Sequence, residues 1–91
     1  MNKIDRVSLI KERLQTALNP AHLIVIDESE EHFGHAGAQS GGGHFSVDIV
    51  ADIFKQKNLP QRHRMIYQAL GELMQSEIHA LRIHAKAPDE K

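Results

Sequence analysis

The sequence predicts a two-layer α+β sandwich in which helices cover one face of a three-stranded mixed sheet. Two stretches carry apolar residues at helical spacing, and three shorter stretches have the alternation or the β-branched content of strands. A chain of 91 residues leaves room for one hydrophobic core. We therefore expect a single domain over residues 1–91, with the order helix, strand, strand, short helix, helix, strand.

The first helix is indicated by a one-sided apolar stripe near the N-terminus. Asn19-Pro20 ends it, because asparagine tolerates the left-handed conformation after a helix and proline cannot continue one. The polar residues between the apolar ones would face solvent. The stripe consists of Ile4, Val7, Ile10, Leu14, Ala17 and Leu18.

Two strands are expected next, around residues 23–26 and 45–51. The first is short and β-branched, and in the second apolar and polar residues alternate. The connection between them, residues 30–43, is rich in glycine and longer than an ordinary hairpin loop, so we expect it to be flexible. Strands joined in this way should pair antiparallel.

The second half of the chain should supply two helices and the last strand. Residues 52–54 suit a short helical turn, and a long helix opens at Leu59-Pro60 and passes through Gly71, which costs up to about 1 kcal/mol relative to alanine. Alternation resumes at Leu81, Ile83 and Ala85 in the third strand. We expect the polar tail, residues 87–91, to be disordered.

Composition narrows the range of functions. The formal net charge is −1 and there is no cysteine, so the chain cannot form a disulfide, a thiolate nucleophile or a self-contained zinc-finger or iron–sulfur site. No apolar run approaches the roughly 20 residues of a membrane span, and no signal peptide is evident. No nucleophile stands beside a base and no Walker-type phosphate loop is present. We expect a cytoplasmic protein that is not an enzyme.

Histidines cluster where the strands are expected to begin. His32 and His35 lie in the glycine-rich connection, and His44 ends it and begins the second strand. A helix crosses between the second and third strands, so as neighbours they would run parallel and begin at the same edge of the sheet. His79 begins the third strand and should therefore lie near the histidine loop.

Strand parity places His79 on the helix-covered face with Leu81 and Ile83, so we expect it to be partly buried at the rim of the core. A single histidine on an apolar face is more often a hydrogen-bonded core residue than a ligand, and loop histidines are usually solvated. Spacing alone therefore favours a structural role over a metal site. If metal is bound, two or three imidazoles leave coordination positions for a partner to fill.

Four motifs, taken in order, resemble the BolA-like family: Asp27-Glu28-Ser29, Gly43-His44-Phe45-Ser46-Val47, Gln61-Arg62-His63-Arg64-Met65-Ile66-Tyr67 and Ile78-His79-Ala80-Leu81. The resemblance implies a fold like the class II KH domain, in agreement with the predicted element order. It also implies a heterodimer with a monothiol glutaredoxin that bridges a [2Fe-2S] cluster, in iron–sulfur trafficking or iron regulation.

The same resemblance implies which side chains bind the cluster. Family members use a histidine at the position of His79 and a histidine or cysteine in the preceding loop, where His32 is the better candidate and His35 the alternative. Glutaredoxin and glutathione thiolates would supply the remaining ligands. We expect no cofactor in the isolated chain, and we expect that chain to be a monomer.

Family members are also described as transcriptional regulators, so DNA binding is the alternative function. The stretch from residue 55 to residue 64 contains no acid, and its basic surface resembles that of a KH-like or helix-turn-helix protein. So few cations support only weak, salt-sensitive binding, and a solvated face or a protein-binding surface explains them equally well. The candidate residues are Lys55, Lys57, Arg62, His63 and Arg64.

Overall fold

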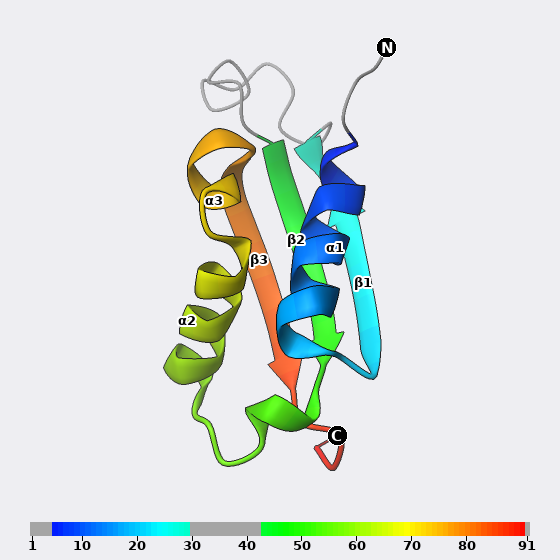
Figure 1. Cartoon of the computed structure of the whole chain (residues 1–91), viewed down its shortest axis with the longest axis vertical. Coiled ribbons are helices and arrows are strands. Elements are labelled where there is room, and N and C mark those ends of the chain that lie inside the picture. Colours follow the sequence, from blue (N-terminus) through cyan, green and yellow to red (C-terminus); the bar gives the residue numbers. More distant parts are fainter. Residues whose placement is uncertain (1–4, 30–42, 91) are drawn as a thin grey trace.

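Helices cover one face of a three-stranded sheet in the computed structural model, which describes residues 5–29 and 43–90 (Figure 1). This arrangement confirms the predicted two-layer α+β fold and its element order. The elements are α1 (Arg6–Leu18), β1 (His22–Asp27), β2 (Gly43–Val50), the 3-10 helix η3 (Asp52–Phe54), α2 (Leu59–Leu70), α3 (Leu73–Ser76) and β3 (Ile78–Lys86).

The sheet is mixed, with strand order β1-β2-β3. β1 pairs antiparallel with β2, placing Val25 opposite Val47. β2 pairs parallel with β3, placing Val47 opposite Ile83. β2 and β3 therefore begin at the same edge, as the crossover argument predicts.

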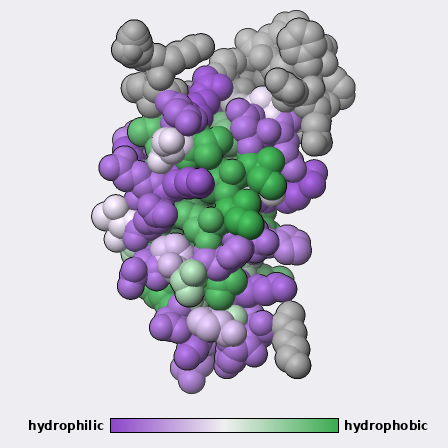
Figure 2. All heavy atoms as spheres, turned by 90° about the vertical axis from the view of Figure 1, so that its right-hand side faces the viewer, coloured by the Kyte–Doolittle hydropathy of each residue, from purple (hydrophilic) through white to green (hydrophobic). Residues whose placement is uncertain are grey.

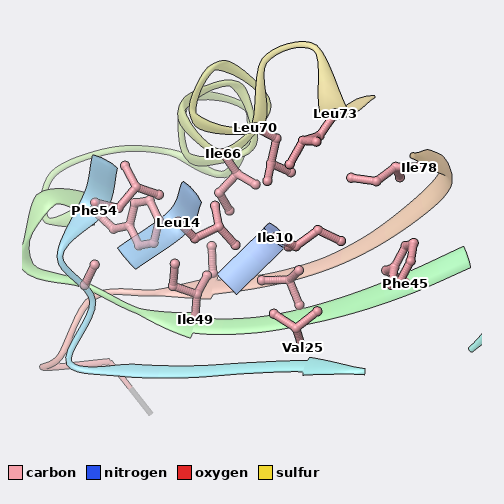
Figure 3. Close-up of a cluster of buried hydrophobic side chains, with 14 of the residues drawn as sticks. Ile10, Leu14, Val25, Phe45, Ile49, Phe54, Ile66, Leu70, Leu73 and Ile78 are labelled. Carbon is pink, nitrogen blue, oxygen red and sulfur yellow. The ribbon is translucent and has the colours of Figure 1, made fainter. Parts of the chain in front are cut away.

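The core lies between the sheet and the helices, and β2, the central strand of the sheet, lines its middle (Figure 3). Phe45, Val47 and Ile49 alternate on the inner face of β2, and each is at most 1% exposed. The helices supply the opposite wall, chiefly through Ile10, Leu14, Phe54, Ile66 and Leu70, all fully buried. Burial of apolar surface contributes roughly 25 cal/mol per Å², so this layer is the main source of stability.

Both long helices begin and end with local signals. Asp5 caps α1, because its carboxylate accepts a hydrogen bond from the Val7 backbone N–H at 3.0 Å. Asn19 ends that helix in the left-handed conformation, with φ of 48°, as predicted. Asn58 and Gln61 form a reciprocal capping box at the start of α2. None of the helices within the described ranges is long and apolar enough to cross a membrane.

The second long helix stops earlier than its apolar pattern predicts. Gly71 has φ of 54° and ψ of −127°, so α2 ends at Leu70 and the separate short helix α3 begins at Leu73. A residue with a Cβ adopts this backbone conformation only at considerable cost. The prediction that the helix continues through Gly71 is therefore wrong.

The polar C-terminal segment is ordered as far as Glu90, which corrects the predicted disorder there. Ala87 is 1% exposed, and the Glu90 carboxylate accepts hydrogen bonds from the Arg62 guanidinium at 2.7 and 2.6 Å. The Ala87 backbone N–H donates to the same carboxylate at 3.1 Å. Arg62 is buried, and a buried guanidinium requires a carboxylate partner, a requirement that composition alone does not reveal.

Glu90→Gln should lower the stability of the fold in a pH-dependent way. Hydrogen bonds from Arg62 and from the Ala87 backbone lower the pKa of Glu90 to about 2. The stabilisation is therefore present above the ordinary glutamate pKa and is lost as pH falls towards 2. Urea unfolding at neutral pH should show a clear loss for the variant, and the difference from the wild type should shrink in acid.

Glu72→Gln is the matched control, because Glu72 also binds an arginine through two hydrogen bonds, at 3.3 and 2.6 Å. Its partner Arg13 is far more exposed than Arg62, with 37% against 7% of the side chain accessible. The loss for Glu72→Gln should be the smaller of the two. Equal losses would contradict the role assigned to the buried guanidinium.

Candidate functional site

Two histidines meet at the edge of the sheet where β2 and β3 begin. The ring centroids of His44 and His79 are 5.1 Å apart, and their planes are inclined by 50°. The residues just before them, Gly43 and Ile78, are paired across the two strands. The predicted convergence of the two strand starts thus brings two imidazoles into contact range.

A bulge in β3 decides how His79 is presented. Gly43 pairs with Ile78 and His44 pairs with Ala80, so His79 is the extra residue of β3. Ile78 is 5% exposed and points into the core, whereas His79 is exposed. The expectation that His79 is partly buried is wrong. It assumed that side chains alternate between the two faces without interruption from Leu81 back to His79, and the bulge breaks this alternation.

The backbone around His44 is anchored on both sides. Its N–H donates to the Ser29 hydroxyl at 3.0 Å, and its carbonyl accepts from the Glu28 N–H at 2.7 Å. The Gly43 N–H donates to the Glu77 carbonyl at 3.0 Å, which ties the start of β2 to the residue before β3. The two strand starts are therefore held together by direct hydrogen bonds.

Gly43 is buried at a position with no room for a side chain. A Cβ there would lie 2.8 Å from the Phe45 ring and 2.9 Å from the Ser29 hydroxyl oxygen. Such separations are shorter than van der Waals contact allows. The glycine thus permits close packing of the strand start against the end of β1.

The surroundings of the pair are open and carry both charges. A depression of about 340 Å³ lies on the outer side of these strand starts. Its lining includes one acidic and one basic residue, so the depression does not carry charge of a single sign. The lining residues are Glu28, His44, Phe45, Ala80, Leu81 and Arg82.

The site differs in membership from the predicted one. His79 is described, whereas His32 and His35 lie outside the described residues. His44, which begins the second strand, is not among the predicted ligands, although the parallel-edge argument also places it beside His79. Within residues 5–29 and 43–90, no group of three or more histidine, cysteine or acidic side chains is placed to hold a metal ion. This part of the chain therefore brings two imidazoles together, which is fewer side chains than a metal site made by these residues alone would need.

One residue of the predicted basic surface, Arg62, does not lie on the surface. Arg62 is buried, and besides Glu90 it donates to the carbonyls of Lys57 and Ala85 at 2.9 and 3.1 Å. Its guanidinium is thus used inside the fold and is not presented to a phosphate. Lys57 and Arg64 are exposed.

The helix-turn-helix likeness also fails, because η3 before α2 has only three residues. His63 is half-buried, while Lys55 is exposed and lies 3.7 Å from an Asp52 carboxylate oxygen. The Gln61 N–H at the start of α2 is bonded within the capping box, and Pro60 has no N–H. Few donors at this helix start are left for an anion.

The fold and the histidine edge together define a small α+β domain, and comparisons with known proteins show its family. The family model for BolA-like proteins matches residues 14–90. The chain belongs to the BolA-like family, which confirms the resemblance drawn from the motifs.

Curated relatives include forms from plants and bacteria. Protein BOLA1, chloroplastic, from Arabidopsis thaliana is 40% identical over 94% of this chain and 56% of its own length. SufE-like protein 1, chloroplastic/mitochondrial, from the same plant is 43% identical over 89% of this chain but only 23% of its own length. The chain thus spans about half of one relative and a quarter of the other. The DNA-binding transcriptional regulator BolA of Escherichia coli is 43% identical over 82% of this chain and 69% of its own length.

Solved structures agree with this placement. The BolA domain of SufE1 from Arabidopsis thaliana matches with a TM-score of 0.85 and 40% identity, covering 99% of this chain and 100% of that one. BolA1 from the same plant matches with a TM-score of 0.83 and 39% identity, covering 99% of both chains. The whole described fold is therefore that of a BolA domain.

Gly43→Ala should disturb the histidine edge. The added methyl group would overlap the Phe45 ring and the Ser29 hydroxyl, and relief of such overlap costs about 1–3 kcal/mol. We expect lower stability in urea unfolding and shifted NMR signals for His44 and His79. Ser46→Ala, in the same strand, is the control and should leave both imidazole spectra nearly unchanged. Unaltered histidine signals in Gly43→Ala would contradict this packing argument.

Proposed function

We propose that this protein is a BolA-like iron–sulfur partner protein that binds a [2Fe-2S] cluster jointly with a monothiol glutaredoxin. The observation that carries the proposal is the exposed imidazole of His79, presented by a bulge beside His44 at an open edge of the sheet. An exposed ligand suits a cluster that lies between two proteins. A binding role, rather than catalysis, is the function that this edge supports.

The donor chemistry fits such a shared cluster. Imidazole nitrogens can replace thiolates on one iron of a [2Fe-2S] centre, and the remaining ligands must then be thiolates. This chain has no cysteine and can supply no thiolate, and in this proposal the glutaredoxin and glutathione supply the thiolates. His79 would be one ligand, with His32 the preferred second and His35 the alternative.

The glycine-rich connection is well placed to supply the second ligand. It leaves β1 after Ser29 and returns at Gly43, and the Ser29 hydroxyl accepts from the His44 N–H. Both ends of the connection are thus anchored at the edge that carries His79. His44 packs against His79, so we assign it the role of positioning that ring.

The chain's residues would control when the cluster is held. The bound cluster would supply redox chemistry and transferable iron and sulfide. Imidazoles bind metal only when deprotonated, so acidification should release the cluster from this side first. The carboxylate of Glu28 and the guanidinium of Arg82 beside the pair give a partner two charges to match.

His79→Ala should abolish the shared cluster. We expect that mixing the wild-type protein with a monothiol glutaredoxin, iron, sulfide and glutathione yields a visible circular dichroism spectrum distinct from that of the glutaredoxin alone. In the His79→Ala variant this spectrum should revert to that of the glutaredoxin, because one iron ligand is lost.

His84→Ala is the matched control, since His84 is an exposed histidine further along the same strand. It should retain the distinct spectrum. A spectrum unchanged by His79→Ala would refute the ligand assignment, and the absence of any distinct spectrum with the wild type would refute the shared cluster itself.

DNA binding is the second candidate, favoured by the name of the Escherichia coli relative, a DNA-binding transcriptional regulator. Of the predicted basic stretch, residues 55–64, the exposed cations are Lys55, Lys57 and Arg64. Three cations supply modest, strongly salt-dependent affinity. The buried Arg62 cannot contribute without breaking its ion pair, so the structure favours the cluster proposal.

If DNA is bound through this surface, Lys57→Ala and Arg64→Ala should each weaken binding. Each lost phosphate contact should reduce the slope of log affinity against log salt by about one. Gel shifts over a range of salt concentrations measure this, with Lys11→Ala on the exposed face of α1 as control. Binding that ignores sequence and vanishes near physiological salt would reduce this function to nonspecific attraction.

A further inference from the structure

We propose that the β1 edge is a docking site for a second copy of this chain, and that the two copies join by antiparallel β1–β1 pairing. Among residues 5–29 and 43–90, β1 lies at the end of the strand order and pairs with β2 on one side only. The Glu28 N–H donates to the His44 carbonyl, so Glu28 and every second residue before it direct their backbone groups towards β2. The backbone groups of Leu23, Val25 and Asp27 are therefore directed away from β2.

β1 lacks the features that usually protect an edge strand. Lysine, proline and bulges keep natural edges from pairing with other chains. β1 contains no lysine, arginine or proline, its one acidic residue is Asp27 at its end, and its ladder with β2 is regular. The other edge strand, β3, has the bulge at His79 and carries Arg82 and Lys86.

Apolar side chains gather beside the free edge. Ile24 and Ile26 project from the sheet face opposite the helices and are 43% and 51% exposed. Figure 2, which views the molecule from the β1 side, shows hydrophobic side chains gathered along this part of the surface. Exposed β-branched residues on an unpaired strand favour addition of another strand.

The side chains of β1 complement themselves in one register. When Val25 of one copy faces Val25 of the other, Ile24 lies opposite Ile26. The same register sets Leu23 opposite Asp27, and it sets His22 opposite Glu28, the residue just after β1, so that an imidazole meets a carboxylate at each end. A register shifted by two residues would oppose His22 to Ile26 and lose both imidazole–carboxylate contacts. The match of Ile24 with Ile26 and of each imidazole with a carboxylate points to a second copy as the occupant.

The proposed dimer leaves the histidine pair accessible. β2 separates β1 from β3, so the copy would dock on the side of the sheet away from His79. The proposal does not rest on cluster binding, and it is the alternative to the expected monomer. A single strand pair buries little area, so the association should be weak and concentration-dependent.

Sedimentation equilibrium tests the dimer over about 10 μM to 1 mM, a range that brackets weak dissociation constants. We expect a monomer–dimer equilibrium for the wild type. Ile24→Lys should raise the dissociation constant at least about tenfold, since it sets a charge in the apolar patch. Ile53→Lys is the control, because Ile53 is 44% exposed but lies in η3, and it should dimerise like the wild type.

Charge exchange and cross-linking test the register. His22→Glu should weaken the dimer by setting two carboxylates opposite each other, and adding Glu28→Lys should restore it. Because the chain has no cysteine, Ile24→Cys mixed with Ile26→Cys should form a disulfide readily. Either variant alone should cross-link poorly.

A wild-type monomer at the highest concentration would overturn the proposal. So would equal dissociation constants for Ile24→Lys and Ile53→Lys. Efficient cross-linking of Ile24→Cys with itself would overturn the register in which Val25 faces Val25. Circular dichroism of each variant confirms that a lost dimer does not reflect an unfolded chain.

Discussion

The parallel pairing of β2 with β3 is the constraint on which the rest of the structure depends. The chain between them, residues 51–77, crosses the sheet as η3, α2 and α3, so both strands must start at the same edge. That return places β2 in the middle of the sheet, where its inner face is fully covered. It also sets His44 against His79. Stability and the candidate site therefore arise from the same topological choice.

Regular patterns in the sequence predict the elements and their order. A bulge interrupts such a pattern, and the sequence shows it only through an irregular spacing of apolar residues. The alternation of Phe45, Val47 and Ile49 shows the buried face of β2 directly. In β3, Ile78 and Leu81 are three residues apart and cannot both face the core of a regular strand. That spacing was the local sign of a bulge, and it changes His79 from a buried residue to an exposed one.

For the location of Arg62, the local run of basic residues is less informative than the helical spacing of buried residues. Arg62 belongs to a run of basic residues, which suggested a surface for phosphate. It also stands four and eight residues before Ile66 and Leu70, on the buried stripe of α2. Its partner Glu90 lies at the far end of the chain, and neither local composition nor spacing relates the two. Only the folded chain shows that this arginine holds the C-terminal turn in place.

The two sides of the sheet differ in what they can bind. The start of β2 and β3 offers imidazoles beside a carboxylate and a guanidinium, a mixed polar surface that discriminates between partners by charge. The β1 edge offers backbone groups and isoleucines, which suit a strand of matching pattern. β2 lies between the two edges, and Glu28, which lines the depression at the histidine edge and directly follows β1, is the residue that both proposals use. If both proposals hold, a partner protein and a second copy would therefore bind different edges of the sheet and meet only near this carboxylate.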